Sequence, residues 1–217
     1  MIQIDSIRAR VFVSAAAAVF AFAATSAQAT PTPLYATQDP TVPSSFTLDF
    51  GDEFGPRTAN ITTTNYTLEI DSPAGEAAFV DYFQTVEPLI LPGGFSTGDI
   101  TVRVVPGSSS GVYDGITGEF STSEFYEVSF TGDLSMFGLE SPVYLPSTSQ
   151  GQINYLSPHA GTISMAWSGQ GVLMDPSDPD NQLVFTYTCA VNTTFIPEPA
   201  SLALLAAGGL ALLRRRR

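Results

Sequence analysis

The sequence predicts an all-β protein, an antiparallel β-sandwich with jelly-roll-like topology, a signal helix before it and a short transmembrane helix after it. Apolar residues alternate with Ser, Thr or acidic residues through six segments, as half-buried antiparallel strands require. Turn-forming Gly, Pro and Asp residues separate these segments. No repeat recurs at a fixed period, which disfavours a solenoid or a propeller.

Residues 1–29 are typical of a secretory signal peptide. A basic start precedes the apolar run from Val11 to Ala24, which is too short to be a good membrane-spanning helix. Ala27 and Ala29 form a small-x-small cleavage pattern, so we expect cleavage before Thr30. No adjacent arginine pair precedes the run, and general secretion machinery is therefore the expected partner.

Residues 30–43 are rich in Pro and Thr and have no period, which favours an extended lead-in with Leu34 and Tyr35 able to dock. An acidic β-sandwich domain is expected over residues 44–194. Its six alternating segments are residues 45–50, 66–70, 100–104, 126–130, 162–167 and 183–191. Asp114-Gly115 is a candidate hairpin turn. Gly75 to Thr85 fits either a short helix or a strand, because Phe79 and Phe83 lie four residues apart.

Charge is distributed unevenly along the chain. Of its 21 acidic residues only Asp5 and Glu198 lie outside residues 30–196, whereas of its eight basic residues only Arg57 and Arg103 lie inside. Such a negative domain repels phosphate backbones, so nucleic acid is not an expected partner. The single cysteine, Cys189, shares a strand face with apolar residues, which favours a buried, inert thiol over an intermolecular bridge.

The last 23 residues, from Phe195 to Arg217, have three parts in order: Pro197-Glu198-Pro199, an apolar run from Ala200 to Leu213, and four arginines. The prolines exclude a continuing sheet, although Pro199 can begin a helix. The cluster of Arg214, Arg215, Arg216 and Arg217 would hold the helix end on the cytoplasmic side of a bilayer. A helix over the run spans about 21 Å, less than the ~30 Å hydrocarbon core.

This tail resembles the PEP-CTERM sorting signal of Gram-negative bacteria, which an exosortase recognises and processes. The resemblance covers residues 195–217 and none of the central domain. It implies that Pro197, Glu198 and Pro199 are recognition elements and that the arginines are the membrane stop. It also implies a transient stay in the inner membrane, processing by an exosortase-type enzyme, and a place at the cell surface alongside exopolysaccharide or biofilm material.

Few features of the domain sequence indicate a catalytic function. A Ser–His–Asp triad would need His159, the single histidine, but no Gly-x-Ser-x-Gly elbow is present and Gly107 to Gly111 indicates a flexible loop. Glu119, Glu124 and Glu127 could form a carboxylate pair of the glycosidase kind. Each is more simply an outward residue on a strand, so we expect a non-enzymatic protein, with a secreted hydrolase as a minor alternative.

Two binding functions stay open. Asp175, Asp178, Asp180 and Asn181 bring hard oxygen ligands into one short acidic loop, which suits calcium but departs from the EF-hand pattern. No other cofactor is expected. A carbohydrate-binding module is the main alternative to a passive matrix protein, because a β-sandwich can present aromatic rings to sugars. The candidate platforms are Tyr113, Phe120, Phe125 and Trp167.

Overall fold

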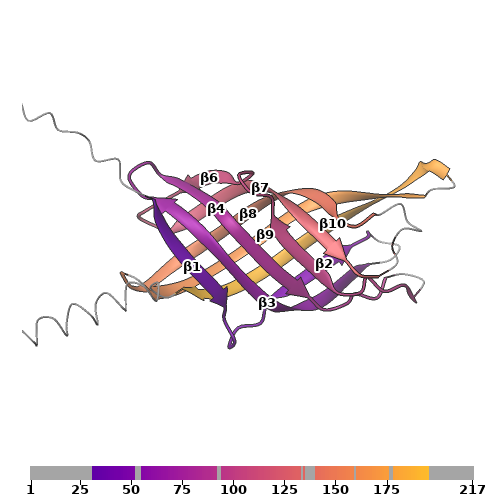
Figure 1. The fold of residues 1–217 in the computed structure, drawn as a ribbon, viewed down its shortest axis with the longest axis horizontal. Helices are drawn as coiled ribbons and strands as arrows, with labels where there is room; N and C mark the ends of the chain where they lie inside the picture. Colours follow the sequence, from indigo (N-terminus) through magenta and orange to yellow (C-terminus); the bar gives the residue numbers. More distant parts are fainter. Residues whose placement is uncertain are drawn as a thin grey trace, which may run out of the picture.

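The computed structural model describes residues 31–51, 55–91, 94–132, 134, 140–158, 160–175 and 178–195. They form ten strands and almost no helix (Figure 1). The strands are β1 (Thr32–Gln38), β2 (Ser45–Asp49), β3 (Pro56–Asp71), β4 (Glu76–Val86), β5 (Ile100–Val104), β6 (Ser110–Tyr113), β7 (Glu119–Phe130), β8 (Val143–Ser157), β9 (Ala160–Asp175) and β10 (Asp178–Phe195). The predicted all-β, antiparallel class is confirmed.

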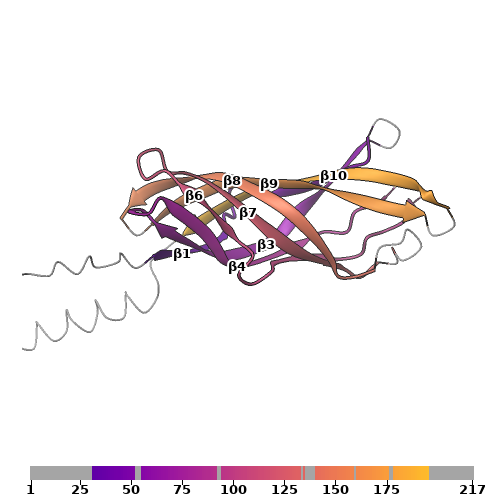
Figure 2. The ribbon, with the colours of Figure 1, turned by 90° about the horizontal axis from the view of Figure 1, so that it is seen from above.

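All ten strands belong to one sheet, and its hydrogen-bonded pairings return to their start. From β3 they pass through β4, β5, β7, β8, β9, β10 and β2 and then reach β3 again. The short β6 bridges β4 and β7, and β1 bridges β3 and β10. Seen from above, the strands lie in two layers (Figure 2). The predicted division into two separate sheets is not confirmed, because the pairings link every strand.

The six alternating segments lie in β2, β3, β5, β7, β9 and β10. Residues 32–38, within the expected lead-in, form β1, which buries Leu34 and Ala36. The turn at Asp114-Gly115 joins β6 to β7 as a hairpin, with Tyr113 paired to Phe120. Its tip is held by Asp114, whose carboxylate accepts from the Ile116 N–H at 2.8 Å.

The helical alternative for residues 75–85 is wrong, because this segment is β4. A bulge explains the misleading pattern: Thr67 pairs with Asp81 and Leu68 with Phe79, which leaves Val80 as an extra residue. Phe79 and Tyr82 therefore both point inward although they are three residues apart. Phe83, on the opposite face, lies under the Arg103 guanidinium, 5.1 Å from its ring centre.

Aromatic rings fill the space that the sheet encloses. Trp167 is fully buried and lies 4.7 Å from the Tyr126 ring, which lies 5.2 Å from Tyr82, which in turn stacks on Tyr66. Aromatic contacts of this kind add about 0.5–1.5 kcal/mol each beyond the burial of their area. Since these rings come from β9, β7, β4 and β3, the core joins strands from around the whole sheet.

Inward-facing glycines make room for these rings. Gly151 is the cross-strand partner of Phe120, and a Cβ at Gly151 would lie 2.7 Å from the Phe120 ring and 2.7 Å from the Met165 Cβ. Gly171 faces Phe185 in the same way on the β9–β10 ladder. The glycines that weaken a strand locally therefore let large rings from the neighbouring strand occupy the interior.

Candidate functional site

Polar side chains form a connected network among the buried rings. The Trp167 indole N–H donates to the Tyr82 hydroxyl at 3.1 Å, and Tyr82 donates to the Gln84 side-chain oxygen. The Cys189 thiol donates to the same oxygen at 3.4 Å. Cys189 is fully buried, as predicted, and burial raises the pKa of its thiol. That the thiol is inert stays a prediction.

Glu124 is the acidic member of the interior. Only 3% of its surface is exposed, and Ser149 donates to its Oε1, while its Oε2 has no hydrogen-bond partner. Ser149 also lies 3.3 Å from the Tyr126 hydroxyl. Burial raises the pKa of the Glu124 carboxyl, because a charge in this site loses its hydration without gaining a cation. Such an acid is costly to bury, which makes it a candidate for function.

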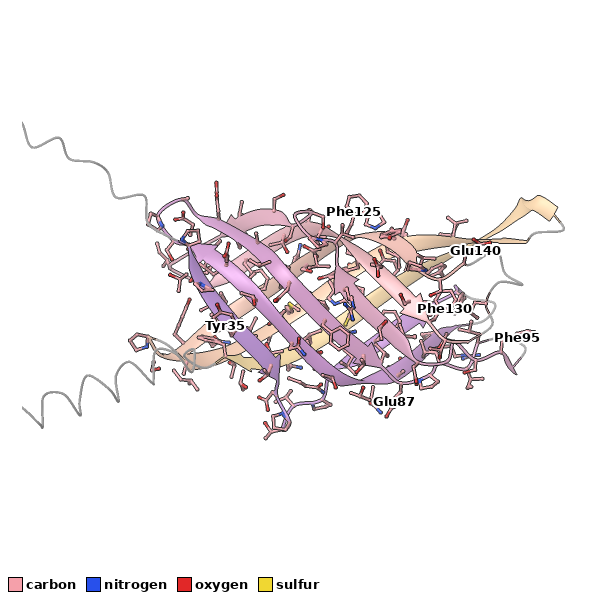
Figure 3. All side chains as sticks on the ribbon, in the orientation of Figure 1. Tyr35, Glu87, Phe95, Phe125, Phe130 and Glu140 are labelled. Carbon is pink, nitrogen blue, oxygen red and sulfur yellow. The ribbon has the colours of Figure 1, made fainter. Side chains whose placement is uncertain are left out.

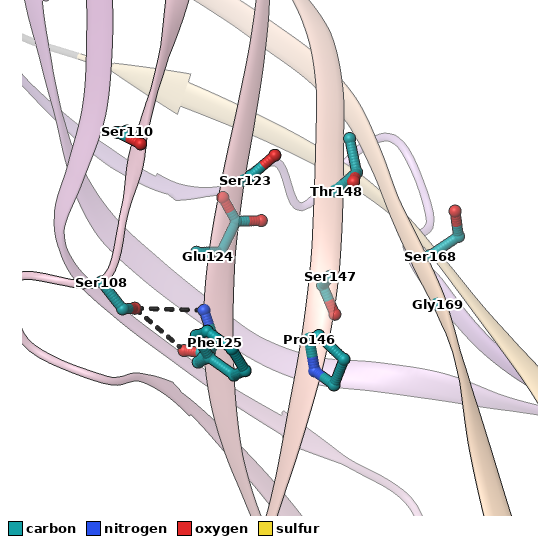
Figure 4. A pocket seen from close by; sticks show the side chains of 10 residues that line it. All are labelled: Ser108, Ser110, Ser123, Glu124, Phe125, Pro146, Ser147, Thr148, Ser168 and Gly169. Carbon is teal, nitrogen blue, oxygen red and sulfur yellow. Dashed lines mark hydrogen bonds between the residues drawn. The ribbon is translucent and has the colours of Figure 1, made fainter.

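A pocket of about 470 Å³ opens beside Glu124, where β8 separates from β9 (Figure 4). The β8–β9 ladder ends at the pair of Thr148 and Ser168. Pro146 lies two positions before Thr148 on β8 and is paired with Phe125 of β7. It has no N–H to donate toward β9, so the β8–β9 ladder does not extend to it. The Tyr187 hydroxyl takes the place of a strand partner by donating to the Pro146 carbonyl at 2.6 Å.

Gly169, on the β9 side of this opening, makes that contact possible. A Cβ at Gly169 would overlap the Tyr187 hydroxyl, so a larger residue would displace the ring. Tyr187 also lies 3.1 Å from the hydroxyl of Ser147, another residue lining the pocket. Pro146, Gly169 and the Tyr187 hydroxyl therefore mark the place where β8 and β9 separate. Residues from the outer and the inner face of the sheet line the same pocket there.

Among the residues that the structure describes, those lining the pocket are rich in hydroxyls and include no basic side chain. Four hydroxyl residues form one cross-strand row over β6, β7, β8 and β9: Ser110, Ser123, Thr148 and Ser168. Phe125, half exposed, stands at the rim on the outside of the sheet (Figure 3). Ser108 fixes the Phe125 backbone, since the Phe125 N–H donates to Ser108 Oγ at 3.1 Å.

The structure separates the residues of the expected carboxylate pair. Glu119, Glu124 and Glu127 all lie on β7, but Glu124 points inward whereas Glu119 and Glu127 point outward. Glu124 lines the pocket, whereas Glu119 and Glu127 do not. The expectation that these three acids line a common cleft is therefore wrong, and so is the expectation that Glu124 is an outer-face residue.

Three of the four expected aromatic platforms are buried. Trp167, Phe120 and Tyr113 belong to the core, and only Phe125 of this group is exposed. Sequence reasoning missed Ser108 and Ser110 at the pocket, because their glycine-flanked serine run indicates only a loop. It missed Ser147 and Ser149 as inward residues because inward serines give no apolar alternation.

A second pocket, of about 340 Å³, lies over β3, β4 and β6 and has an acidic lining that includes Glu69, Asp71 and Glu76. Within the part of the chain that the structure describes, no three His, Cys, Asp or Glu side chains are grouped closely enough to hold a metal ion. Asp175 and Asp178 end β9 and begin β10, where they pair with each other. The side chains of Asp175, Asp178, Asp180 and Asn181 lie outside the described residues, so calcium stays a prediction.

Several predicted positions also lie outside the described residues: Ala27, Ala29, His159, Pro197, Glu198, Pro199 and Arg214 to Arg217. No helix among the residues that are described has the length and apolar character to cross a membrane. Strand β10 ends at Phe195, at the first residue of the tail.

Comparisons with known proteins identify the tail and leave the central domain unassigned. The family described as the PEP-CTERM protein-sorting motif matches residues 195–217, which confirms the resemblance. No curated protein matches the chain. Nine solved chains match, among them the outer membrane protein OprG from Pseudomonas aeruginosa, at 13% identity and a TM-score of 0.28. That match covers 75% of this chain and 92% of OprG, and it indicates nothing about function.

Proposed function

We propose that this chain is an exported, non-enzymatic surface or matrix protein that is anchored briefly by its C-terminal tail and then processed by an exosortase-type enzyme. The match of residues 195–217 to the sorting motif carries this proposal. Strand β10 ends at Phe195, so the matched motif begins in the sequence where this strand ends. The separation of Glu119 and Glu127 from Glu124 supports the non-enzymatic part.

The mass of the protein recovered from producing cells tests this proposal. The wild-type chain is expected to begin near Thr30 and to end near Pro197. A variant carrying both Pro197→Ala and Glu198→Ala is expected to keep Arg214 to Arg217 and to remain in the membrane fraction. Ser201→Ala, within the apolar run, is the matched control and should be processed normally. A mature wild-type chain that retains the four arginines would contradict the proposal.

We further infer that the strands form a closed single sheet around one filled interior, in place of two separate sheets. The double pairing of β3 with β2 and with β4 supports this arrangement. Hydrogen exchange of β3 amides tests it. Amides of Ala59 and Ile61 lie on the β2 side of β3, where the Ile61 N–H donates to the Ser44 carbonyl. Those of Asn65 and Thr67 lie on the β4 side, where the Thr67 N–H donates to the Asp81 carboxylate, and both sets should be protected alike. Rapid exchange along one whole side of β3 would indicate an open edge.

A second candidate function is carbohydrate binding, in keeping with the expected association with exopolysaccharide. One observation favours it: an exposed aromatic ring, Phe125, stands at the rim of a hydroxyl-lined pocket. Retention of the protein on immobilised neutral polysaccharides, compared with bare resin, tests this function independently of how the tail is processed. Elution of the protein with the unbound fraction from every polysaccharide would exclude it.

A further inference from the structure

We propose that the pocket between β8 and β9 binds one neutral sugar residue of a polysaccharide, with Phe125 as the stacking surface and Glu124 as the hydrogen-bonding group at its floor. This inference rests on the second candidate function, to which it adds a site and a ligand class. It concerns the domain alone and does not depend on the sorting of the tail.

Phe125 has the position that a stacking ring needs. Half of its surface is exposed, whereas the residues directly before and after it, Glu124 and Tyr126, point to the other face and are buried. Its backbone is held on two sides, because Ser108 Oγ accepts from the Phe125 N–H and the Val105 N–H donates to the Phe125 carbonyl at 2.8 Å. A ring on a fixed backbone loses little freedom when a flat, apolar face of a sugar packs against it.

The row of hydroxyls suits the polar edge of a sugar. Ser123, Thr148 and Ser168 are outward and in register across three adjacent strands, so their hydroxyls repeat at about 4.8 Å. Each hydroxyl can donate one hydrogen bond and accept others, as the hydroxyls of a sugar can. A volume of about 470 Å³ falls in the range of sites for small ligands.

Glu124 supplies the buried anchor of the site. It lines the pocket while 97% of its surface is covered, and its Oε2 is without a partner. A buried polar atom without a hydrogen-bond partner destabilises the protein, and a hydrogen bond from a sugar hydroxyl would remove that cost. Because the lining has no Lys or Arg and the chain is strongly acidic, an anionic sugar would gain no charge partner there.

The hydroxyl row also continues beyond the pocket. Ser168 pairs with Thr188 of β10, whose side chain is exposed on the same outer face. Thr188 lies three strands from β7, roughly 14 Å at the spacing of paired strands, so a third sugar residue of a bound polymer would reach it and a disaccharide in the pocket would not. Thr188 should therefore matter for a polymer and not for a short ligand.

Saccharide titrations of the mature protein recovered from producing cells test the proposal. The probes are cellobiose, maltose and lactose, with glucuronic acid as the anionic comparison, and binding is followed by saturation-transfer NMR. We expect at least one neutral disaccharide to bind and glucuronic acid not to bind. Phe125→Ala should weaken that binding about tenfold, as the loss of a stacked aromatic contact does, and Glu124→Leu should weaken it similarly.

Two matched variants control these effects. Tyr144→Ala removes an exposed aromatic ring of β8 that does not line the pocket, and it should leave disaccharide binding unchanged. Thr188→Val should leave the disaccharide unaffected and weaken retention on the matching polysaccharide. If Glu124→Leu fails to fold, amide shifts of Ser123, Thr148 and Ser168 in the wild-type protein, followed during saccharide titration, locate the site.

The outcomes are distinct. Disaccharide binding that survives Phe125→Ala, or that shifts no pocket amide, overturns this site and leaves the carbohydrate-binding function standing. An absence of binding to every neutral saccharide overturns both. A rise in melting temperature with calcium that Glu124→Gln abolishes, without any saccharide binding, would instead assign the pocket to a cation and overturn the proposal. None of these outcomes changes the processing result for the tail.

Discussion

The two sides of the ten-stranded sheet share one interior but have different outer surfaces. From Val143 to Val172 and from Val184 to Phe195, covering β8 and most of β9 and β10, the sequence contains no Asp, Glu, Lys or Arg. Strands β3, β4 and β7 carry acids, and one pocket on that side is lined by three of them. An uncharged face on a strongly acidic protein favours contact with uncharged polymers, whereas the acidic side favours solubility.

The largest effect should come from the interior that both sides share. Trp167→Ala removes a fully buried ring that contacts Tyr126 and hydrogen-bonds to Tyr82, so we expect the free energy of unfolding to fall by about 3–5 kcal/mol. Urea denaturation measures the change. Phe125→Ala is the control, because an exposed ring should change the free energy of unfolding by about 0.5 kcal/mol. Equal effects for the two rings would mean that the core is not common to both sides.

A smaller loss is expected where a glycine gives space to an aromatic ring. Gly151→Ala places a Cβ 2.7 Å from the Phe120 ring and from Met165, and overpacking of this kind costs about 1–3 kcal/mol. Gly115→Ala is the matched control, since its nearest neighbour is the Tyr113 ring at 3.8 Å. Chemical denaturation of the two variants compares them. A Gly151→Ala protein as stable as the Gly115→Ala protein would show that the wall adjusts freely.

Glu124 should make stability depend on pH. Its folded-state pKa is raised, so the folded protein holds the proton more tightly than the unfolded chain does. Stability from this group is therefore greatest at pH values below the ordinary glutamate pKa and falls as the pH rises through the raised value. Glu124→Gln should remove this dependence and raise the melting temperature near neutral pH by about 2–4 °C per kcal/mol gained.

Thermal unfolding of the wild-type protein and the Glu124→Gln variant between pH 4 and 8 measures this difference. Glu127→Gln is the control, because Glu127 points outward on the same strand and accepts a hydrogen bond from Tyr144 at 3.3 Å. The interpretation fails if Glu124→Gln and Glu127→Gln unfold with the same pH profile.

The smallest effect should follow an exchange of charge between the two outer faces. Thr188→Glu adds an acid to the uncharged side and Glu69→Thr removes one from the acidic side. Both positions lie on the outside, so each change should alter the free energy of unfolding by about 0.5 kcal/mol or less. Retention on neutral polysaccharide should fall for Thr188→Glu and stay constant for Glu69→Thr. Equal retention of both variants would remove any functional difference between the faces.

Strand positions followed from the sequence wherever one face is apolar. Residues 183–191 illustrate this, because Phe185, Tyr187, Cys189 and Val191 are all buried as their spacing predicts. Strand β8 did not show the pattern, since its inward positions include Ser147 and Ser149. The segment around Phe79 also fitted a helix although it is a strand, because a bulge changes the spacing of its inward residues from two to three. Periodicity detects strands with apolar inward faces and no insertions.

The candidate site was only partly predictable. Phe125 was one of four expected platforms. The alternation of Tyr126, Val128 and Phe130 places Phe120 inward and Phe125 outward only if one strand runs without a break from Glu119 to Phe130, which the structure shows. The difference is their parity on β7, which depends on which face meets the other strands. The burial of Glu124 has the same cause. Its position on β7 turns it inward, so an acid that would be solvated on the outer face is buried.

The sequence by itself determined the strand-rich class, the acidic character of the domain and the identity of the sorting tail, because each is local in the chain. Only the tertiary structure decided that all ten strands form one sheet, that β7 runs without a break from Glu119 to Phe130, and where β8 leaves β9. These features depend on pairings between residues far apart in sequence, and local composition does not encode them. The pocket illustrates both levels: Pro146 and Gly169 are visible as residues, but only the fold places them opposite Tyr187 and next to Glu124.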